Sequence, residues 1–444
     1  MKRICLILSF LFFISGCGNE TGFNEQDLRI PSGFVRVVHA MPDAPRLITK
    51  IQARRLPLLN FGESTPYQPT IPEIERKLEI SFFNGNDETI VATQAISVPN
   101  EHLFTVIIAG TIAAPEIITF SNEQPTSKEE ISIQIFNASI QDSNSYDFYL
   151  TRDNEPPSTP NFQLSPLQVS ASYQTPAALN YHLQFSKTGT SEIIWNSGPF
   201  QIPETSSNPL FILLDNFGAG PEPVRVMGYD NERLTFSKDP TNSAIRIAHM
   251  IADAGPLDIY VEGELIDQNI SFQDVGMIKE VGSGDKAFLI TNAGKSDEVL
   301  LEEFLALSPG EFHTVALINR KEEPLAVINT DAFRRIPQAM TVTVSNYSAN
   351  AADVSVFVLE TGQDPSDSFP ISQQRLGQTT INTVPENNYE FFVYNRLSNA
   401  LLAGPLTLTA SSKALYRVYI ADQFDPSLPI QLLLGDDLDP PFEP

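Results

Sequence analysis

Residues 35–45 read V-R-V-V-H-A-M-P-D-A-P, and residues 245–261 read I-R-I-A-H-M-I-A-D-A-G-P-L-D-I-Y-V. Both begin with alternating apolar residues, continue through a histidine and reach a turn that contains Asp-Ala. Weaker copies begin near Ile131 and Met340. Because side chains of a β-strand point to opposite faces in turn, this alternation predicts a strand with one buried face. The sequence therefore predicts four repeats of one all-β unit.

Three blocks recur in a constant order within each repeat, as expected of tandem units. Opening strands are expected at 35–40, 131–138, 245–250 and 340–347, middle strands at 77–83, 181–185, 286–291 and 389–394, and closing strands at 102–109, 210–214, 312–318 and 415–420. Taking His39, Asn137, His249 and Asn346 as equivalent gives spacings of 98, 112 and 97 residues.

Further apolar stretches bring each unit to about seven strands, which is typical of an immunoglobulin-like sandwich. The predicted fold is therefore a series of four immunoglobulin-like antiparallel β-sandwiches, at 34–121, 130–230, 243–331 and 339–436. Residues 46–55 show no clean strand. Residues 298–307 also fit a helical turn, but their position in the repeat favours a strand. Residues 437–444 are expected to form an acidic tail.

The N-terminus is typical of a bacterial lipoprotein signal peptide. Lys2 and Arg3 precede an apolar run at 4–14, which is too short to span a bilayer because spanning requires about 20 residues. The run leads to Ile-Ser-Gly-Cys, which resembles a lipobox. Residues 1–16 are therefore expected to be removed, and Cys17 is expected to carry fatty acids such as palmitate, with a tether at 17–33. Gly at position 18 favours an outer-membrane location, by analogy with enteric lipoproteins.

Composition excludes several classes of function. The two cysteines, Cys5 and Cys17, are assigned to the signal peptide and the lipid, so the mature chain has no thiol for catalysis or zinc binding. The formal net charge of −26 disfavours nucleic acid as a partner, since phosphate backbones are also negative. The chain contains no G-x-S-x-G and no phosphate-binding loop.

The opening stretches resemble an uncharacterised family of bacterial envelope proteins, a domain of unknown function. Its repeats begin with R-V-x-H-x-x-P-D-A-P, continue into a D-V-Y-V-D-G strand and close with Y-T-V-x-V-x-G. Repeat one matches the opening through Arg36, His39 and Asp43, and repeat three matches it through Arg246 and His249. Repeats two and four lack the P-D-A-P turn. The resemblance implies a β-sandwich in the cell envelope. It does not point to any particular activity.

A polar side chain ends the inward face of every opening strand: His39, Asn137, His249 and Asn346. Both residue types can bind nearby backbone, so we expect hydrogen bonds to the following turn, or to Asp43 and Asp253 in the two histidine repeats. A metal or catalytic role is disfavoured because asparagine replaces histidine in half of the units. It would regain support if the rings of His39 and His102 met beside a carboxylate.

Other candidate sites carry weaker signals. No cofactor is expected, but the oxygen-rich loops at 142–147 and 364–368 suit calcium, although the same residues also simply form turns. The one tryptophan, Trp195, has apolar neighbours that favour a core position. Carbohydrate binding would instead require exposed aromatic residues around Trp195 or in the tyrosine-rich fourth repeat.

The expected function is that of a non-enzymatic, membrane-anchored lipoprotein whose four sandwiches form a binding, adhesion or spacer surface in the cell envelope. The alternative is a polysaccharide- or protein-binding module of an envelope assembly, and a hydrolase has no feature in its favour. Polar, proline-bearing junctions favour limited bending between neighbours. Sandwiches placed end to end would form a rod on the order of 150 Å long.

Overall fold

A computed structural model describes residues 32–435, except 85–86, 123–126, 128, 141–143, 153–155, 203–207, 216–223, 230–232, 237–241, 332 and 426. The predicted signal peptide, Cys17, most of the tether and the predicted acidic tail lie outside the described residues. Within the described residues, no helix is both long enough and apolar enough to cross a membrane.

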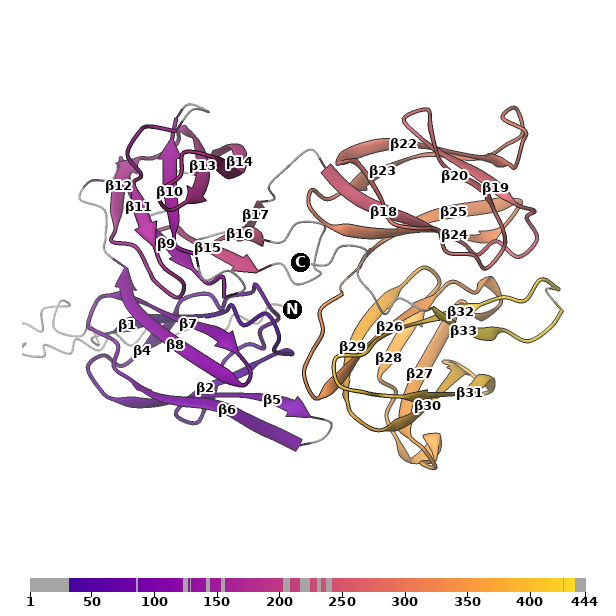
Figure 1. Cartoon of the computed structure of the whole chain (residues 1–444). Coiled ribbons are helices and arrows are strands. Elements are labelled where there is room, and N and C mark those ends of the chain that lie inside the picture. Colours follow the sequence, from indigo (N-terminus) through magenta and orange to yellow (C-terminus); the bar gives the residue numbers. More distant parts are fainter. Residues whose placement is uncertain are drawn as a thin grey trace, which may run out of the picture.

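The strands form eight sheets, which face each other in pairs as four β-sandwiches (Figure 1). Seven of the sheets have four strands, and one sheet of sandwich 2 has five. This architecture confirms the prediction of repeated β-sandwich units. The described residues also include two 3-10 helices, η2 (Ala349–Ala351) and η3 (Pro365–Asp367).

The strands follow the chain in order through the four sandwiches. Sandwich 1 contains β1 (Gly33–His39), β2 (Ile48–Ile51), β3 (Arg54–Arg55), β4 (Gln68–Thr70), β5 (Arg76–Asn84), β6 (Asp87–Ile96), β7 (Leu103–Thr111) and β8 (Ala114–Asn122). Sandwich 2 contains β9 (Glu130–Asn137), β10 (Tyr146–Thr151), β11 (Phe162–Leu164), β12 (Tyr173–Pro176), β13 (Asn180–Lys187), β14 (Ile193–Gln201), β15 (Leu210–Asp215), β16 (Val224–Tyr229) and β17 (Arg233–Phe236).

The second half of the chain repeats this arrangement. Sandwich 3 contains β18 (Asn242–His249), β19 (Leu257–Val261), β20 (Glu264–Ile270), β21 (Lys279–Gly282), β22 (Gly284–Asn292), β23 (Val299–Leu307), β24 (Phe312–Arg320) and β25 (Glu323–Asp331). Sandwich 4 contains β26 (Ala339–Asn346), β27 (Asp353–Glu360), β28 (Ser372–Arg375), β29 (Thr379–Pro385), β30 (Asn388–Asn395), β31 (Leu401–Thr409), β32 (Leu415–Ala421) and β33 (Gln431–Gly435).

Each opening strand lies in the middle of a sheet, beside the closing strand of its own unit. In sandwich 1 the sheets have the orders β4-β1-β7-β8 and β3-β2-β5-β6. β1 runs parallel to β7, and the pairs β9–β15, β18–β24 and β26–β32 are parallel in the same way. The other strand pairs of the described residues are antiparallel. The units are therefore immunoglobulin-like in having two facing sheets, but their strand order differs from that of the immunoglobulin fold. One strand pair in each unit is parallel, contrary to the prediction of fully antiparallel sheets.

The predicted opening, middle and closing strands are all present, with ends displaced by a few residues. Residues 298–307 lie almost entirely in strand β23, so the helical alternative is wrong. The prediction that 46–55 lacks a strand is also wrong, because β2 and β3 lie there. β2 has only four residues, Ile-Thr-Lys-Ile, and polar residues follow it, so its alternation is too short to recognise.

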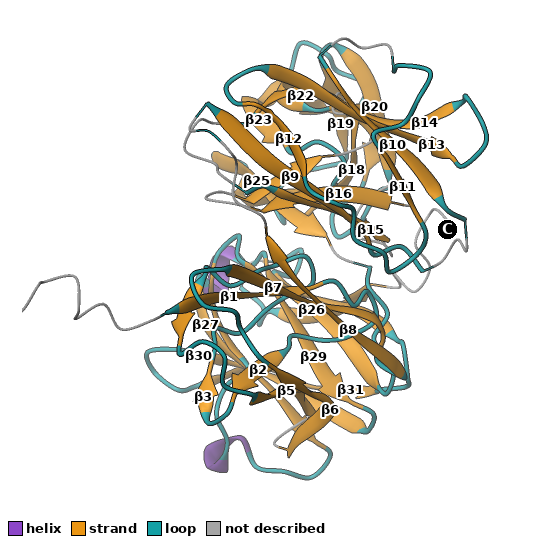
Figure 2. Cartoon of the chain, turned by 90° about the vertical axis from the view of Figure 1, so that its left-hand side faces the viewer, coloured by secondary structure: helices purple, strands orange, loops and turns teal. Residues whose placement is uncertain are grey.

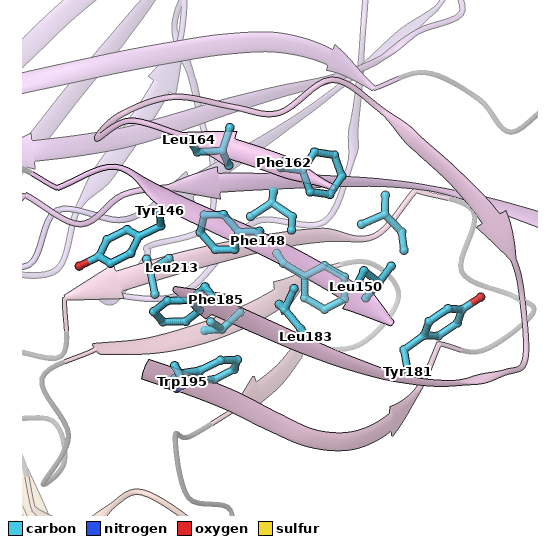
Figure 3. Close-up of a cluster of buried hydrophobic side chains, with 14 of the residues drawn as sticks. Tyr146, Phe148, Leu150, Phe162, Leu164, Tyr181, Leu183, Phe185, Trp195 and Leu213 are labelled. Carbon is cyan, nitrogen blue, oxygen red and sulfur yellow. The ribbon is translucent and has the colours of Figure 1, made fainter. Parts of the chain in front are cut away.

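Each sandwich has a separate hydrophobic core between its sheets. Figure 3 shows the core of sandwich 2, in which aromatic side chains from β10, β13 and β14 meet. Trp195 is 2% exposed, and its ring stacks on Phe185 at a centroid distance of 5.1 Å. The predicted core position of Trp195 is thus confirmed, and the residue is excluded as a carbohydrate platform.

Sandwiches 1 and 2 share a further apolar cluster, so they form a pair. On β1, Val35 and Val37 belong to the core of sandwich 1, while Val38 packs with Phe136 and Ile212 of sandwich 2. The opening strand is consequently buried on both faces. This double burial explains its nearly continuous apolar sequence, since strands covered on both sides lose strict alternation.

Sandwiches 3 and 4 pair through the equivalent strands. Ala248 and Ile318 of sandwich 3 pack with Tyr347 and Tyr419 of sandwich 4, whose rings stack at 5.8 Å. A smaller cluster lies beside it and includes Phe333, in the segment that joins the two sandwiches. The structural repeat is therefore a two-sandwich module that occurs twice.

The two modules lie side by side, with sandwiches 1 and 4 at one level and sandwiches 2 and 3 at the other (Figures 1 and 2). The expected end-to-end rod with bending junctions is therefore wrong. The polar composition of the junctions predicts the rod. The sandwiches of each module contact each other instead through the outer faces of their opening and closing strands. The apolar residues on these faces cannot be told from core residues by pattern alone.

Candidate functional site

The four polar residues that end the opening strands all bind the backbone of the following turn. His39 accepts a hydrogen bond from the N–H of Met41 through Nδ1 (3.2 Å), and its Nε2 lies 3.1 Å from the carbonyl oxygen of Pro45. His249 makes the same contacts with Ile251 and Gly255, at 3.3 and 3.0 Å. Both nitrogens of each ring are therefore occupied by backbone.

The asparagines reproduce this arrangement with an amide. Asn137 accepts from the N–H of Ser139 and donates to the carbonyl oxygen of Leu164. Asn346 accepts from Ser348 and donates to Ala351. All four side chains are fully buried. The expected hydrogen bonds to turn backbone are thus present in every unit.

Burial keeps the two histidines neutral. It lowers the pKa of His39 from 6.5 to about 3, and the nearby Arg334 guanidinium acts in the same direction, against the hydrogen bond to Pro45. Burial also lowers the pKa of His249. A neutral ring matches the observed contacts, because one nitrogen accepts a hydrogen bond from a backbone N–H while the other donates one to a carbonyl oxygen.

The aspartates of the turns do not bind these histidines but tie the turn to a distant hairpin. Asp43 accepts a hydrogen bond from the N–H of Ile112, and Asp253 accepts one from Lys321. In the even-numbered sandwiches the carboxylate does not lie in the turn itself. It comes from the end of the closing strand, where Asp215 and Asp422 bind the turn that follows the opening strand.

The remaining histidines are separate from this arrangement. Nδ1 of the exposed His102 lies 2.7 Å from the carbonyl oxygen of Asn100, at the opposite end of the β1–β7 pair from His39. His313 is buried beside Ser308, and His182 lies in β13. The rings of His39 and His102 therefore do not meet. Among the described residues, no three His, Cys, Asp or Glu side chains form a group that could hold a metal.

In each of the two loops considered for calcium, one described aspartate accepts hydrogen bonds from neighbouring protein groups. Asp364 caps η3 by accepting from the N–H of Ser366, and this hydrogen bond lowers the pKa of its carboxyl. In the other loop, Asp142 and Ser143 lie outside the described residues. Asp147 accepts from Gln163, Thr188 and the N–H of Gly189.

The arginine of each opening pattern lies in the interface between paired sandwiches. Arg36 donates to the carbonyl oxygen of Tyr229 at 3.1 Å and lies 4.6 Å from the ring of Tyr67. In the second module, Arg246 and Arg417 share the carboxylate of Asp331 at 3.1 and 2.7 Å. These buried arginines are therefore structural residues of the two modules.

A cleft with a cavity volume of 630 Å³ lies between sandwiches 1 and 4. Its charged lining residues are Arg46 and Arg334, and no aspartate or glutamate lines it among the residues that the structure describes. Interfaces between domains are common positions for binding sites. The apolar side chains of isoleucine, leucine and phenylalanine that line the cleft are Ile48, Leu58 and Phe83 on one side and Ile336, Ile371 and Ile381 on the other.

Arg334 fixes the two sides of this cleft relative to each other. It lies in the segment between sandwiches 3 and 4 and donates to the carbonyl oxygens of Pro42 and Ala44 at 2.8 and 2.7 Å. Its guanidinium lies 4.5 Å from the ring centroid of Phe61. Burial lowers the pKa of Arg334 to about 9, helped by Arg225 and opposed by Asp43, so the side chain stays charged at neutral pH. The cleft walls are therefore joined by a partly buried cation.

Comparison with known proteins gives a family but no activity. The family model "Domain of unknown function (DUF4397)" matches residues 33–149 and 243–357, which together exceed half of the chain. Each match begins with the opening strand of an odd-numbered sandwich and ends inside the second strand of the next, β10 or β27. The matched unit thus includes the partner's opening strand, which helps to form the interface within each module.

Two solved structures show weak likeness. The Bacillus anthracis TIE protein is 10% identical, with 89% of this chain and 69% of that chain covered and a TM-score of 0.15. A candidate cell adhesion protein from Bacteroides uniformis is 8% identical, with 46% and 99% covered and a TM-score of 0.18. At these scores neither likeness supports an inference. No curated protein matches the chain.

Proposed function

The chain belongs to the DUF4397 family, and from this premise we propose that it is a non-enzymatic binding protein of the bacterial cell envelope, anchored to the outer membrane by a lipid on Cys17. Membership supplies the sandwich units and leaves their role open. The observation that carries the proposal is the cleft between sandwiches 1 and 4, which combines an apolar lining with two arginines on a chain of net charge −26.

The scaffold around the cleft suits binding. The histidines of the opening strands and the paired arginines are engaged in turns and interfaces, so they stiffen the molecule. A preformed site on a rigid scaffold binds with less loss of conformational entropy than a flexible one. A protein partner is favoured over a polysaccharide, because Trp195 lies in a core.

The binding role is tested by capture from an envelope extract. The full chain, purified in detergent, is expected to retain specific proteins, and Arg46→Glu is expected to retain less of them. Lys321→Glu, which makes the same charge change on an exposed turn of sandwich 3, serves as the control. Equal capture by all three proteins would contradict a role for the cleft. Substrate turnover in a general hydrolase screen would contradict the non-enzymatic proposal.

The anchor is tested separately in the producing cell. Wild-type protein is expected to incorporate labelled palmitate and to sediment with membranes, and Cys17→Ser is expected to lose both properties. Protease treatment of intact cells then distinguishes a surface-facing protein, which is cleaved, from a periplasmic one. Membrane association that survives Cys17→Ser would rule out the lipid as the anchor.

A further inference from the structure

Strand β29 forms an open edge along the cleft. It is the outermost strand of the sheet β29-β26-β32-β33, and no described strand pairs with its outer side. Three consecutive residues of it, Ile381, Asn382 and Thr383, line the cleft. Consecutive residues of a strand point to opposite faces, so a surface lined by three in a row is the strand's edge. In Figure 1, β29 lies on the side of sandwich 4 that faces sandwich 1.

The hydrogen-bond pattern of β26 shows which peptide groups face outward. Asn346 receives the N–H of Gly377 at its carbonyl oxygen and donates its own N–H to Gln378, so it faces the β29 side. Thr341 donates its N–H to Ala414, at the start of the β32 side. Because residues alternate in direction along a strand, the even-numbered residues of β26 face β29.

The register then identifies the free groups on β29. Val344 lies opposite Thr380, and Val342 lies opposite Asn382. Thr380 and Asn382 therefore direct their peptide groups back to β26. By the same alternation, Ile381 and Thr383 direct theirs into the cleft, where each offers one N–H and one carbonyl oxygen to another strand.

The three equivalent strands of the other units are short or blocked. β4 has three residues, and the carbonyl oxygen of its Pro69 accepts from Arg54. β12 has only four residues, and β21 has four as well and carries Lys279 and Glu280. β29 is seven residues long, T-T-I-N-T-V-P, and has no charged residue. Proteins normally protect sheet edges by shortness, charge or proline, so β29 is available for pairing.

The chemistry of the cleft defines the occupant. Ile381 and Phe83 are about half exposed, at 47% and 51%, and can receive apolar side chains. The exposed Arg46 adds a positive charge to a cleft whose described lining contains no carboxylate. We propose that a partner protein inserts an extended segment that pairs with β29, alternates apolar side chains and places an acidic side chain beside Arg46. This inference rests on the proposed binding role and specifies the partner and the site.

A peptide selection tests the inference. Phage-displayed random nonapeptides are selected on the full chain in detergent, and enriched peptides are then synthesised and measured by fluorescence anisotropy. Enriched sequences are expected to alternate apolar residues and to contain aspartate or glutamate. Thr383→Pro is expected to weaken their binding at least tenfold, because it removes an outward N–H, while Thr383→Ser keeps that N–H and is expected to bind normally. Peptides N-methylated on the pairing edge are also expected to lose binding.

Two controls make the result decisive. Proline is tolerated where the N–H of an edge strand faces outward, so the melting temperature of Thr383→Pro is expected to stay close to that of wild type. Arg46→Glu is expected to weaken acidic peptides about tenfold, whereas Lys321→Glu is expected to leave them unchanged.

Three outcomes would overturn the inference. Enriched peptides that bind Thr383→Pro as tightly as wild type would refute edge pairing, and the broader binding role would still stand on the capture experiment. Failure to enrich any peptide above empty micelles would refute a peptide occupant. A wild-type dimer that Thr383→Pro converts to a monomer, seen by analytical ultracentrifugation, would identify a second copy of the chain as the occupant.

Discussion

At the positions that end the opening strands, histidine and asparagine make the same hydrogen bond to the backbone of the following turn. Each side chain accepts from the N–H two residues onward, as His39 and Asn346 show. Three of them donate to a carbonyl five or six residues onward, whereas Asn137 donates to Leu164 in β11. The sequence predicts these positions and their bond to the following turn because that contact is local. The role rests on fixed atoms a few residues away, so spacing along one strand is sufficient to infer it.

The equivalence predicts unequal effects of two substitutions at His39. His39→Ala leaves a buried N–H and a buried carbonyl without partners, which costs about 1–3 kcal/mol each in the free energy of unfolding. His39→Asn is expected to cost less, because an amide keeps the bond to Met41, as Asn137 does with Ser139. Urea denaturation of both variants checks the order, and equal losses would show that the ring itself is required.

The depressed pKa of His39 predicts acid sensitivity. Its folded-state pKa of about 3 lies below the ordinary 6.5, mainly through burial, so protons bind the unfolded chain more strongly. The contribution to stability is complete above pH 6.5 and is lost as pH falls from there towards 3, by up to ~1.4 kcal/mol per pH unit. Denaturation between pH 7 and 4 is expected to show a shallower decline for His39→Asn. His102→Asn, at an exposed histidine, is expected to follow wild type.

The carboxylates that complete these turns escape sequence analysis. Asp215 binds the N–H of Ile140, and Asp422 binds that of Ala349, both more than seventy residues away in sequence. No local spacing connects such partners. The odd-numbered units place the carboxylate in the turn and the even-numbered units place it on the closing strand, so the residues do not align as a repeat.

At the scale of strands, alternation predicts where elements lie better than what covers them. The opening strand β18 is recognised from Ile245 and Ile247, which face the core. Its other face carries Ala248, which packs against sandwich 4, and Arg246, whose partner Asp331 also binds Arg417 of sandwich 4. Period two reveals one buried face and gives no sign that the second is buried too, because the partner sheet lies far along the chain.

The buried charges between sandwiches 3 and 4 predict a large loss when their acid is removed. Asp331→Ala leaves the guanidinium groups of Arg246 and Arg417 without this carboxylate, and breaking a buried pair costs about 3–5 kcal/mol. Asp353→Ala removes an exposed ion pair with Arg396, for which a loss below about 1 kcal/mol is expected. Thermal unfolding of both variants gives the comparison, and similar small shifts would mean that water reaches Asp331.

At the scale of the whole molecule, packing between sandwiches replaces the rod expected from the sequence. Junction composition is a poor guide here because the junctions do not form the contacts. The Arg334 link joins a segment near the middle of the second module to the turn at Pro42, almost three hundred residues earlier. A single cation among 28 lysines and arginines carries no mark of such a role in sequence.

Solution scattering distinguishes the two shapes. The wild-type maximum dimension is expected to fall well below the ~150 Å of four sandwiches placed end to end. Arg334→Ala is expected to lengthen it, because the variant loses the hydrogen bonds to Pro42 and Ala44 that hold the modules together. Arg335→Ala, which removes the neighbouring arginine and its hydrogen bond to the carbonyl oxygen of Lys413 in sandwich 4, is the matched control. An unchanged profile for Arg334→Ala would show that other contacts suffice.

The parallel pairing of β1 with β7 has a consequence for how the protein is made. Phe34 lies opposite Leu103, so β1 leaves the ribosome well before the strand with which it pairs. The outer face of β1 is covered later still, when Phe136 and Ile212 of sandwich 2 have been made. Non-local pairing of this kind slows folding and exposes apolar strands to aggregation. We therefore expect the nascent chain to be most prone to aggregation while β1 is exposed, before β7 and the facing strands of sandwich 2 have been made.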